Sequence, residues 1–203
     1  IQEFSEPRTS VIREQVGGRI EEWATDDNDA PGGTWPTKIN YGAWIATGDV
    51  VNAEWLLCAA DDISFTPGWW EATELLRNDG VTQVIGTNDS ADGTGNEWVA
   101  RGVHTCHPLI AAQYVRDRGT VDQKGQAVCP LYKHWWVDNE LVETAKARNV
   151  WAFCKDAVLE HNHPFWKGMD LWDDTYQLGN NQQTADHDQQ VWLSRMGLIR
   201  EEA

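Results

Sequence analysis

Positive charge is scarce in this chain of 203 residues, where 16 Lys and Arg accompany 32 Asp and Glu and give a formal net charge of -16. A surface this acidic repels the phosphate backbone of nucleic acids at long range, so duplex DNA is not expected as a default partner. The acidity favours solubility, and some of the carboxylates are also candidates for holding a cation.

The chain also lacks a segment that suits a membrane. Its longest apolar run, Trp55–Ala60, is far shorter than the roughly 20 residues needed to cross a bilayer. No basic stretch followed by an apolar one opens the sequence, so no signal peptide is predicted. We therefore expect no membrane partner and a cytoplasmic protein, located in the host cytoplasm if it is viral.

Closely spaced cysteines are absent too. The four cysteines form no CxxC pair, which argues against zinc-ribbon and thioredoxin-like folds. Cys58 lies in an apolar run and is expected to be an ordinary core thiol. The others are Cys106, Cys129 and Cys154, and reduced thiols are the simplest expectation for all four.

Tryptophan, in contrast, is abundant, with 13 residues. Each indole offers a large apolar face and one N–H donor. Most of these side chains are expected to pack in the core. Because sugar rings stack on the same kind of face, Trp69, Trp135 and Trp136 are also candidates for an acceptor site.

The distribution of apolar and turn residues predicts alternating strands and helices. Strands are expected over 54–60, 81–86, 97–105 and 150–160, and helices over 38–47, 69–77, 108–118, 138–148 and 185–196. This alternation is typical of an α/β layered domain. No internal repeat or linker is found, so we expect a single domain over 1–203, in which 1–30 is an atypical start and 180–203 a helical tail.

Two adjacent carboxylates, Asp61 and Asp62, directly follow the first predicted strand. Ligands of α/β sheets bind at the carboxyl ends of strands, which is where this pair is expected. Two like charges there are costly unless a cation or hydrogen bonds offset them. Mg²⁺ and Mn²⁺ take carboxylates together with phosphate oxygens. A turn-forming or helix-capping role is the alternative.

A third carboxylate, Asp138, stands at the start of a predicted helix. Capping that helix is its simplest role. A carboxylate that faces a metal site from a helix start can also act as a general base. Glu140 falls in the first turn, where a negative charge suits the helix dipole.

Two histidines, His161 and His163, follow the last predicted strand. Residues spaced i and i+2 project to the same side of an extended chain. Imidazole suits Mn²⁺, Zn²⁺ and Fe²⁺, so the pair is a candidate for metal binding. The alternative is two hydrogen-bonded surface histidines.

The order of these motifs along the chain is informative. The segments that carry it are Lys38–Gly42, Trp55–Asp62, Pro67–Trp69, Val137–Leu141 and Val158–Pro164. This ordered set resembles family 2-like glycosyltransferases of the GT-A type and, within that group, compact phage-associated glycosyltransferases. In that family an Asn-bearing helix precedes a strand that ends in the acidic metal motif, and a later ED motif supplies the base. The resemblance covers residues 38–195.

The resemblance implies a fold and a reaction. The fold is α/β and GT-A-like (Rossmann-like), with a mixed, mostly parallel central sheet flanked by helices. The reaction is transfer of a sugar from a nucleotide-sugar donor, with a UDP-sugar favoured, to a hydroxyl acceptor with inversion. Asp62, with Asp61, His161 and His163, would hold Mn²⁺ or Mg²⁺, and Asp138 would be the catalytic base.

The substrate contacts that the resemblance implies involve two further sets of residues. The donor would meet Asp26, Asp27, Lys38, Asn40 and Asp61. The acceptor, which would be a glycan, a protein or a modified nucleobase, would meet Trp69, Trp135, Trp136 and Glu140.

Two departures from the family pattern bear on these expectations. Val137 stands where the ED motif has Glu, and Ala60 stands where the acidic motif has a further Asp, which makes Asp62 the stronger candidate ligand. The usual first strand is not evident in residues 1–30. Two other functions therefore stay open: a non-catalytic, Trp-rich carbohydrate-binding or virion-associated module, and a metal-dependent phosphoester hydrolase. The oligomeric state is not predicted.

Overall fold

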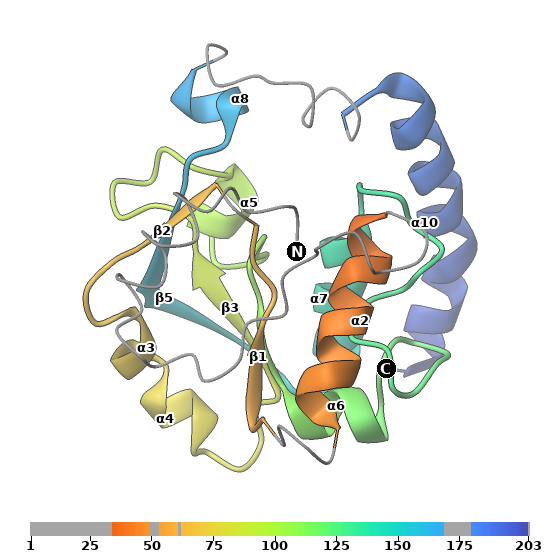
Figure 1. Ribbon diagram of the computed structural model, residues 1–203, viewed down its shortest axis with the longest axis horizontal. Helices are drawn as coiled ribbons and strands as arrows, with labels where there is room; N and C mark the ends of the chain where they lie inside the picture. The colour runs from red at the N-terminus through yellow and green to blue at the C-terminus, as the bar shows by residue number, and fades with distance from the viewer. Residues whose placement is uncertain (1–33, 49–52, 61, 169–179, 203) are drawn as a thin grey trace.

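The computed structural model of the chain describes residues 34–48, 53–60, 62–168 and 180–202 (Figure 1). Its strands are β1 (Trp55–Leu57), β2 (Ile63–Phe65), β3 (Val84–Asn88), β4 (Leu109–Ala111) and β5 (Trp151–His161). Its helices are α2 (Trp35–Thr47), α3 (Trp69–Ala72), α4 (Glu74–Arg77), α5 (Glu97–Ala100), α6 (Ala112–Asp117), α7 (Val137–Ala147), α8 (Pro164–Lys167) and α10 (Gln182–Glu202). No helix in these ranges combines the length and the apolar character that a membrane span requires.

The strands form one five-stranded mixed sheet in the order β1-β4-β3-β5-β2, with helices on both sides. This confirms the α/β class. The expectation of a mostly parallel sheet is wrong, because only β3 and β5 pair in parallel, while β1–β4, β3–β4 and β2–β5 are antiparallel.

The error in strand direction has a local cause at 108–118, which was expected to be one helix. Its first residues form β4, which pairs antiparallel with both β1 and β3, and only Ala112–Asp117 is helical. A short apolar run does not distinguish a buried strand from a buried helix. The strand expected over 97–105 is likewise absent: α5 begins there, capped by the Asn96 side chain, which accepts a hydrogen bond from Trp98 N.

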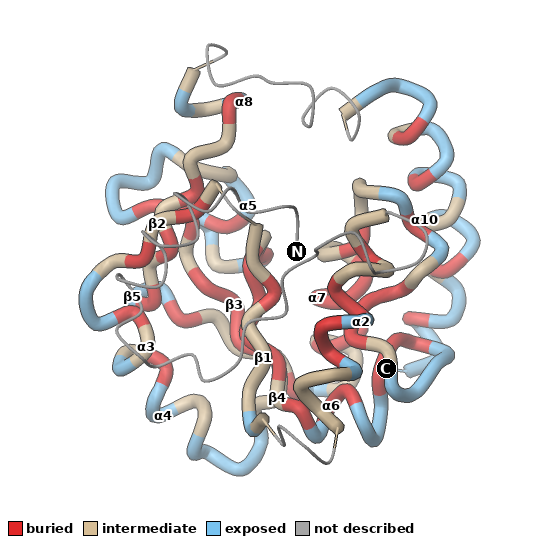
Figure 2. The backbone as a smooth tube through the Cα atoms, in the orientation of Figure 1, coloured by how far each residue is buried: buried red, intermediate tan, exposed pale blue. Residues whose placement is uncertain are grey.

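Both faces of the sheet are buried, as side-chain alternation along its central strands requires. Val84 and Ile110 pack into a cluster with side chains from α2, α6 and α7. Their neighbours Ile85 and Leu109 pack on the opposite face, against side chains of α3 and α4. Figure 1 shows α2, α6, α7 and α10 in the right half of the view and α3 and α4 at the lower left, and Figure 2 shows the buried residues following the strands between them.

Strand β5 is irregular where it runs beside β3. Gly86 pairs with Phe153, but Asn88 pairs with Val158, so the register shifts within two residues of β3. Only glycine fits at position 86 without a rearrangement, because a Cβ atom there would lie 2.3 Å from the indole of Trp151. Strand β5 therefore continues beyond the last residue of β3, and its end lies beside the loop that follows β3.

Helix α10 fixes the loop that leads into α7. The buried carboxylate of Asp188 accepts hydrogen bonds from the consecutive backbone N–H groups of Lys133, His134 and Trp135, at 2.9, 2.8 and 2.8 Å. Such a concave run of N–H groups is an anion-binding arrangement, here filled by the protein's own carboxylate. The next residue, Trp136, has a positive φ of 66°, a conformation that costs energy for a side chain of this size.

A buried ion pair joins the same two helices. Arg195 of α10 donates from Nε to Glu140 Oε2 at 2.6 Å and from Nη2 to Glu140 Oε1 at 2.9 Å. Glu140 also accepts a hydrogen bond from the hydroxyl of Tyr132, and Arg195 donates to Asp122 at the surface. Both charges of the central pair are therefore compensated inside the protein.

Replacing Arg195 with Met is expected to lower the free energy of unfolding by about 3–5 kcal/mol, because Glu140 stays buried without its counter-charge. Urea denaturation measures this change. The matched control is Arg101→Met, which removes an exposed ion pair with Glu97 and is expected to cost less than about 1 kcal/mol. Equal losses in the two variants would contradict the structural role assigned to Arg195.

Candidate metal centre

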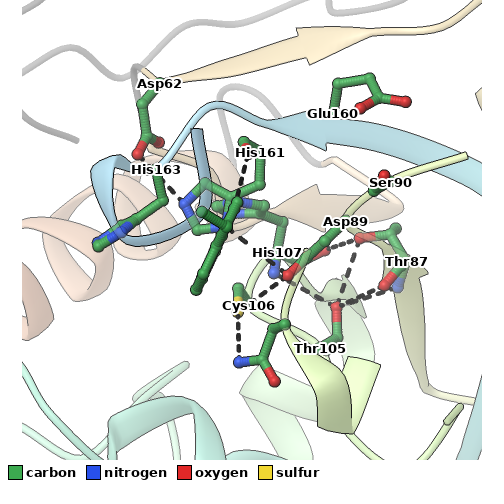
Figure 3. A network of polar contacts seen from close by, with 12 residues as sticks. Asp62, Thr87, Asp89, Ser90, Thr105, Cys106, His107, Glu160, His161 and His163 are labelled. Carbon is green, nitrogen blue, oxygen red and sulfur yellow. Dashed lines mark hydrogen bonds and ion pairs between the residues drawn. The ribbon is translucent and has the colours of Figure 1, made fainter. Parts of the chain in front are cut away.

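Four segments that lie far apart in the sequence meet at one end of the sheet. They are residue 62 just before β2, the loop after β3, the segment 104–107 before β4, and the end of β5. Figure 3 shows Asp62, Asp89, Cys106, His107 and His161 from these segments with their side chains turned toward one another. The first residues of α7 complete the group from a further direction.

Strand pairing explains why Asp62 and His161 are neighbours. Ile63 is the register partner of His161 in the antiparallel pair of β2 and β5, so the residue before Ile63 lies beside the end of β5. Two backbone hydrogen bonds fix this end: Asn162 N donates to Asp62 O at 2.7 Å, and His161 N donates to Asp89 O at 2.9 Å.

The imidazole of His161 lies between two carboxylates. Its Nε2–H donates to Asp62 Oδ2 at 3.2 Å, and its Nδ1 is 3.7 Å from Asp89 Oδ2. Burial alone would lower the pKa of His161, but the contacts with the two carboxylates outweigh it and raise the pKa to about 9. The carboxylates of Asp62 and Asp89 therefore favour a positive charge at the position of the His161 ring.

His107 is the least satisfied polar side chain of the site. It is 3% exposed, its ring centroid is 4.4 Å from that of His161, and neither of its ring nitrogens has a hydrogen-bond partner among the described residues. Burial, with the charge of His161 as a second cause, lowers the pKa of His107 to about 4. Buried polar atoms without partners are rare in proteins and need an explanation. A neutral imidazole with a free lone pair is the form that binds metals.

Threonine hydroxyls hold the segment that carries His107 against β3. Thr87 N donates to Thr105 Oγ1, and Thr105 Oγ1 donates to Thr87 O, both at 3.1 Å. The hydroxyl of Thr87 donates to His107 O at 2.6 Å. The position of His107 is therefore set through its backbone (Figure 3). Its own ring nitrogens make no hydrogen bond with the described residues.

Asp138 enters the cluster from the first turn of α7. His104 Nε2–H donates to Asp138 Oδ2 at 3.1 Å, and Asn139 N donates to Asp138 Oδ1 at 2.9 Å. Burial would raise the pKa of Asp138, but the charge and hydrogen bond of His104 lower it below its ordinary value. The side chain is 24% exposed, so solvent and a ligand can reach it.

The donor atoms form three triads whose members all lie within 4.8 Å of one another. The triads are Asp62–His107–His161, Asp89–Cys106–His161 and His104–Cys106–Asp138. Carboxylate, imidazole and thiol groups at these separations can converge on a metal ion. The arrangement therefore supports a metal centre, with nitrogen and sulfur donors as well as oxygen.

The structure brings three of the predicted site residues together. Asp62, Asp138 and His161 each belong to a triad, but His163 belongs to none of those found among the described residues. Its Nδ1 accepts a hydrogen bond from Phe165 N and caps α8. Asp26, Asp27 and Asp61 lie outside the described residues.

Four other predicted contacts have structural roles. Asn40 donates to Val128 O at 2.7 Å and accepts from Val128 N at 3.0 Å, which uses its buried amide to hold α2. Glu140 is buried in its pairing with Arg195. Trp69 is buried in a cluster with β2 and β5, and Trp136 stacks on Trp192 of α10 at 5.9 Å.

Two further predicted contacts, like Trp136, keep part of their surface exposed. Lys38 is half-buried on α2 and Trp135 is half-buried beside His134, with ring centroids 5.8 Å apart. Neither belongs to a metal-ligand triad.

Sequence reasoning missed Asp89, His104, Cys106 and His107. Segment 97–105 was interpreted as a strand, which concealed the density of donors in the four residues His-Thr-Cys-His at 104–107. Three potential ligands in four residues are the signal that could have revealed the site. Asp89 is hidden in a stretch rich in Asp, Gly, Ser and Asn, whose composition indicates only a loop.

Replacing His107 with Leu is expected to stabilise the metal-free protein by about 1–3 kcal/mol, because it removes buried polar atoms that have no partner. Denaturation in the presence of EDTA measures the change. His104→Leu is the matched contrast: it removes a partnered imidazole and leaves Asp138 without its hydrogen bond, so it should destabilise. A loss of stability in His107→Leu comparable to that in His104→Leu would show that His107 has an unrecognised partner.

Comparison of the chain with protein-family models, with curated proteins and with solved structures gave no match.

Proposed function

We propose that this chain is a metal-dependent glycosyltransferase that moves a sugar from a nucleotide-sugar donor to a hydroxyl acceptor with inversion. The observation that carries the proposal is the convergence of Asp62, Asp138 and His161. These residues stand in three separate motifs that resemble those of family 2-like glycosyltransferases, and their triads are linked through Cys106 and His161, which form a third triad with Asp89.

The residues present fit the divalent ion that the resemblance implies. Asp62, His107 and His161 offer one carboxylate and two imidazoles, a set that suits Mn²⁺ better than Mg²⁺. A cation at this point would take one of the two unpartnered nitrogens of His107 and would offset the charge of the carboxylates around His161. When bound, such an ion neutralises the negative charge that develops on the leaving diphosphate.

Asp138 is suited to accept the proton of the acceptor hydroxyl. Its lowered pKa keeps the carboxylate ionised at neutral pH, and its partial exposure leaves it open to an acceptor. As the acceptor oxygen bonds to the anomeric carbon, its proton passes to Asp138 and the bond from that carbon to the diphosphate oxygen breaks. His104 fixes the carboxylate through Oδ2, and this reduces the motion needed before proton transfer.

The half-buried Trp135 is a predicted sugar contact that lies three residues before Asp138 in the chain. The backbone N–H of Trp135 is fixed by Asp188, so its indole is held by a rigid loop. Sugar rings stack on such apolar faces. This supports an acceptor position beside the start of α7.

A metal-dependent phosphoester hydrolase is the second candidate function. It is favoured by the nitrogen and sulfur donors His107, His161 and Cys106, which suit Zn²⁺. The two functions differ in their need for an acceptor: a hydrolase turns over a phosphoester in water alone, whereas the transferase requires a hydroxyl substrate.

Replacing Asp138 with Asn is expected to lower sugar transfer by about 10²–10⁴-fold, because the general base is lost, while Mn²⁺-dependent stabilisation by the nucleotide is retained. Thermal unfolding with a panel of nucleoside diphosphates, with and without Mn²⁺, measures binding. At about 100 times the dissociation constant a ligand stabilises the folded protein by roughly 2.7 kcal/mol.

Two further variants make this test specific. Asp62→Ala should lose the Mn²⁺-dependent shift, and Asp156→Asn, which alters an exposed carboxylate on β5, should lose neither binding nor transfer. If no nucleotide shifts the unfolding temperature but a glycan does, the chain is a carbohydrate-binding module. Turnover of a phosphoester without an acceptor would instead support the hydrolase.

A further inference from the structure

Two of the three triads found among the described residues share no residue, and the third, Asp89–Cys106–His161, overlaps both. One is Asp62–His107–His161, and the other is His104–Cys106–Asp138. The short segment 104–107 contributes to both: His104 and Cys106 belong to one triad and His107 to the other. A single ion at the first triad therefore leaves the second set of ligands complete.

A second observation points to a ligand beside Cys106. Asp89 is 1% exposed, and its Oδ2 accepts the thiol hydrogen bond of Cys106 at 3.5 Å. Its other oxygen, Oδ1, is buried and has no hydrogen-bond partner in the part of the chain that the structure describes. A buried, unpartnered carboxylate oxygen next to a thiol is costly unless a cation is present. Figure 3 shows the Asp89 carboxylate and the Cys106 thiol adjacent to each other.

The first and second triads differ in their donor atoms, because only the second of these two includes sulfur. The first triad offers only oxygen and nitrogen, which Mn²⁺ accepts, whereas the second contains a thiol. Thiolate combined with imidazole and carboxylate is a ligand set that selects Zn²⁺ or a similar thiophilic ion over Mn²⁺ and Mg²⁺.

We infer that His104, Cys106 and Asp138 form a second metal site, selective for Zn²⁺, and that filling this site switches off sugar transfer. Coordination requires the thiolate and a ring nitrogen of His104 without a proton, so binding releases the Cys106 proton to solvent and the Nε2 proton of His104 is released or moves to Nδ1. The hydrogen bond from His104 to Asp138 is given up because both side chains become ligands. Asp138 then holds a cation and no longer accepts a proton from the acceptor. Inhibition rests on the proposed function, whereas the metal site itself does not.

Titration with Co²⁺ tests the second site directly. Among the described groups, Cys106 also belongs to the triad Asp89–Cys106–His161, but Mn²⁺ in the first triad engages His161, so under Mn²⁺ a thiolate-to-cobalt charge-transfer band reports occupancy of the second site. The band should disappear in Cys106→Ser and persist in Cys129→Ser, which alters another buried thiol. His104→Gln, which removes a different ligand, should weaken Co²⁺ binding and serves if Cys106→Ser fails to fold by circular dichroism. A band that survives in Cys106→Ser, or that never appears, overturns the inference.

The same proteins test the inhibition. Zn²⁺ added at about one equivalent against a large excess of Mn²⁺, so that Mn²⁺ keeps the first triad, is expected to lower Mn²⁺-supported transfer by about 10²-fold or more, the contribution of a general base. The quantity compared is the ratio of rates with and without Zn²⁺, which should be close to one in Cys106→Ser and strongly lowered in Cys129→Ser. Equal inhibition of both variants overturns the regulatory role.

The two proposals fail in different ways. A Cys106-dependent cobalt band without transfer from any nucleotide sugar sinks the glycosyltransferase and supports the second metal site. Transfer that needs Mn²⁺, in a protein that gives no thiolate band, supports the glycosyltransferase and overturns the second site.

Discussion

The antiparallel pairing of β2 with β5 is the contact on which the site depends. It joins residues almost a hundred positions apart and places His161 between the carboxylates of Asp62 and Asp89. A shift of one residue in this pairing would turn His161 to the opposite face of the sheet, where Glu160 now points, and the donor cluster would not form. The irregular register between β3 and β5 serves the same end, because it brings Asp89 beside the end of β5.

Much of the architecture could be predicted from the sequence where the pattern was long. Helices α2, α7 and α10 were expected from their apolar spacing. Strands β3 and β5, which form the parallel pair, were expected within a few residues of their observed bounds. Strand β4 was not, because three apolar residues directly before a helix carry no period of their own. Strand β2 was not expected either, and every antiparallel pair among the described strands contains β2 or β4, so missing these two strands reversed the expected character of the sheet.

The candidate site was predicted in part for a similar reason. Asp62, Asp138 and His161 follow or precede elements that the pattern identifies, so their positions were meaningful before the structure. His107 and Asp89 lie in loops whose conformations depend on long-range contacts, here the hydrogen bonds to Thr87 and the backbone contact with His161. Proteins often tolerate locally unfavourable groups at functional sites and compensate for them elsewhere. The buried ion pair of Arg195 and the three hydrogen bonds to Asp188 are suitable compensation.

The hydrogen bonds that Asp188 accepts also affect when, during folding, the candidate site can form. Asp188 belongs to α10, which follows every other described element in the chain, yet its carboxylate fixes the loop that sets the first turn of α7. Until α10 has been synthesised and has docked, the three N–H groups before α7 lack their acceptor, and the strained backbone at Trp136 has nothing to hold it. Asp138 therefore reaches its position late, and a nascent chain can form its sheet well before it can form the candidate site.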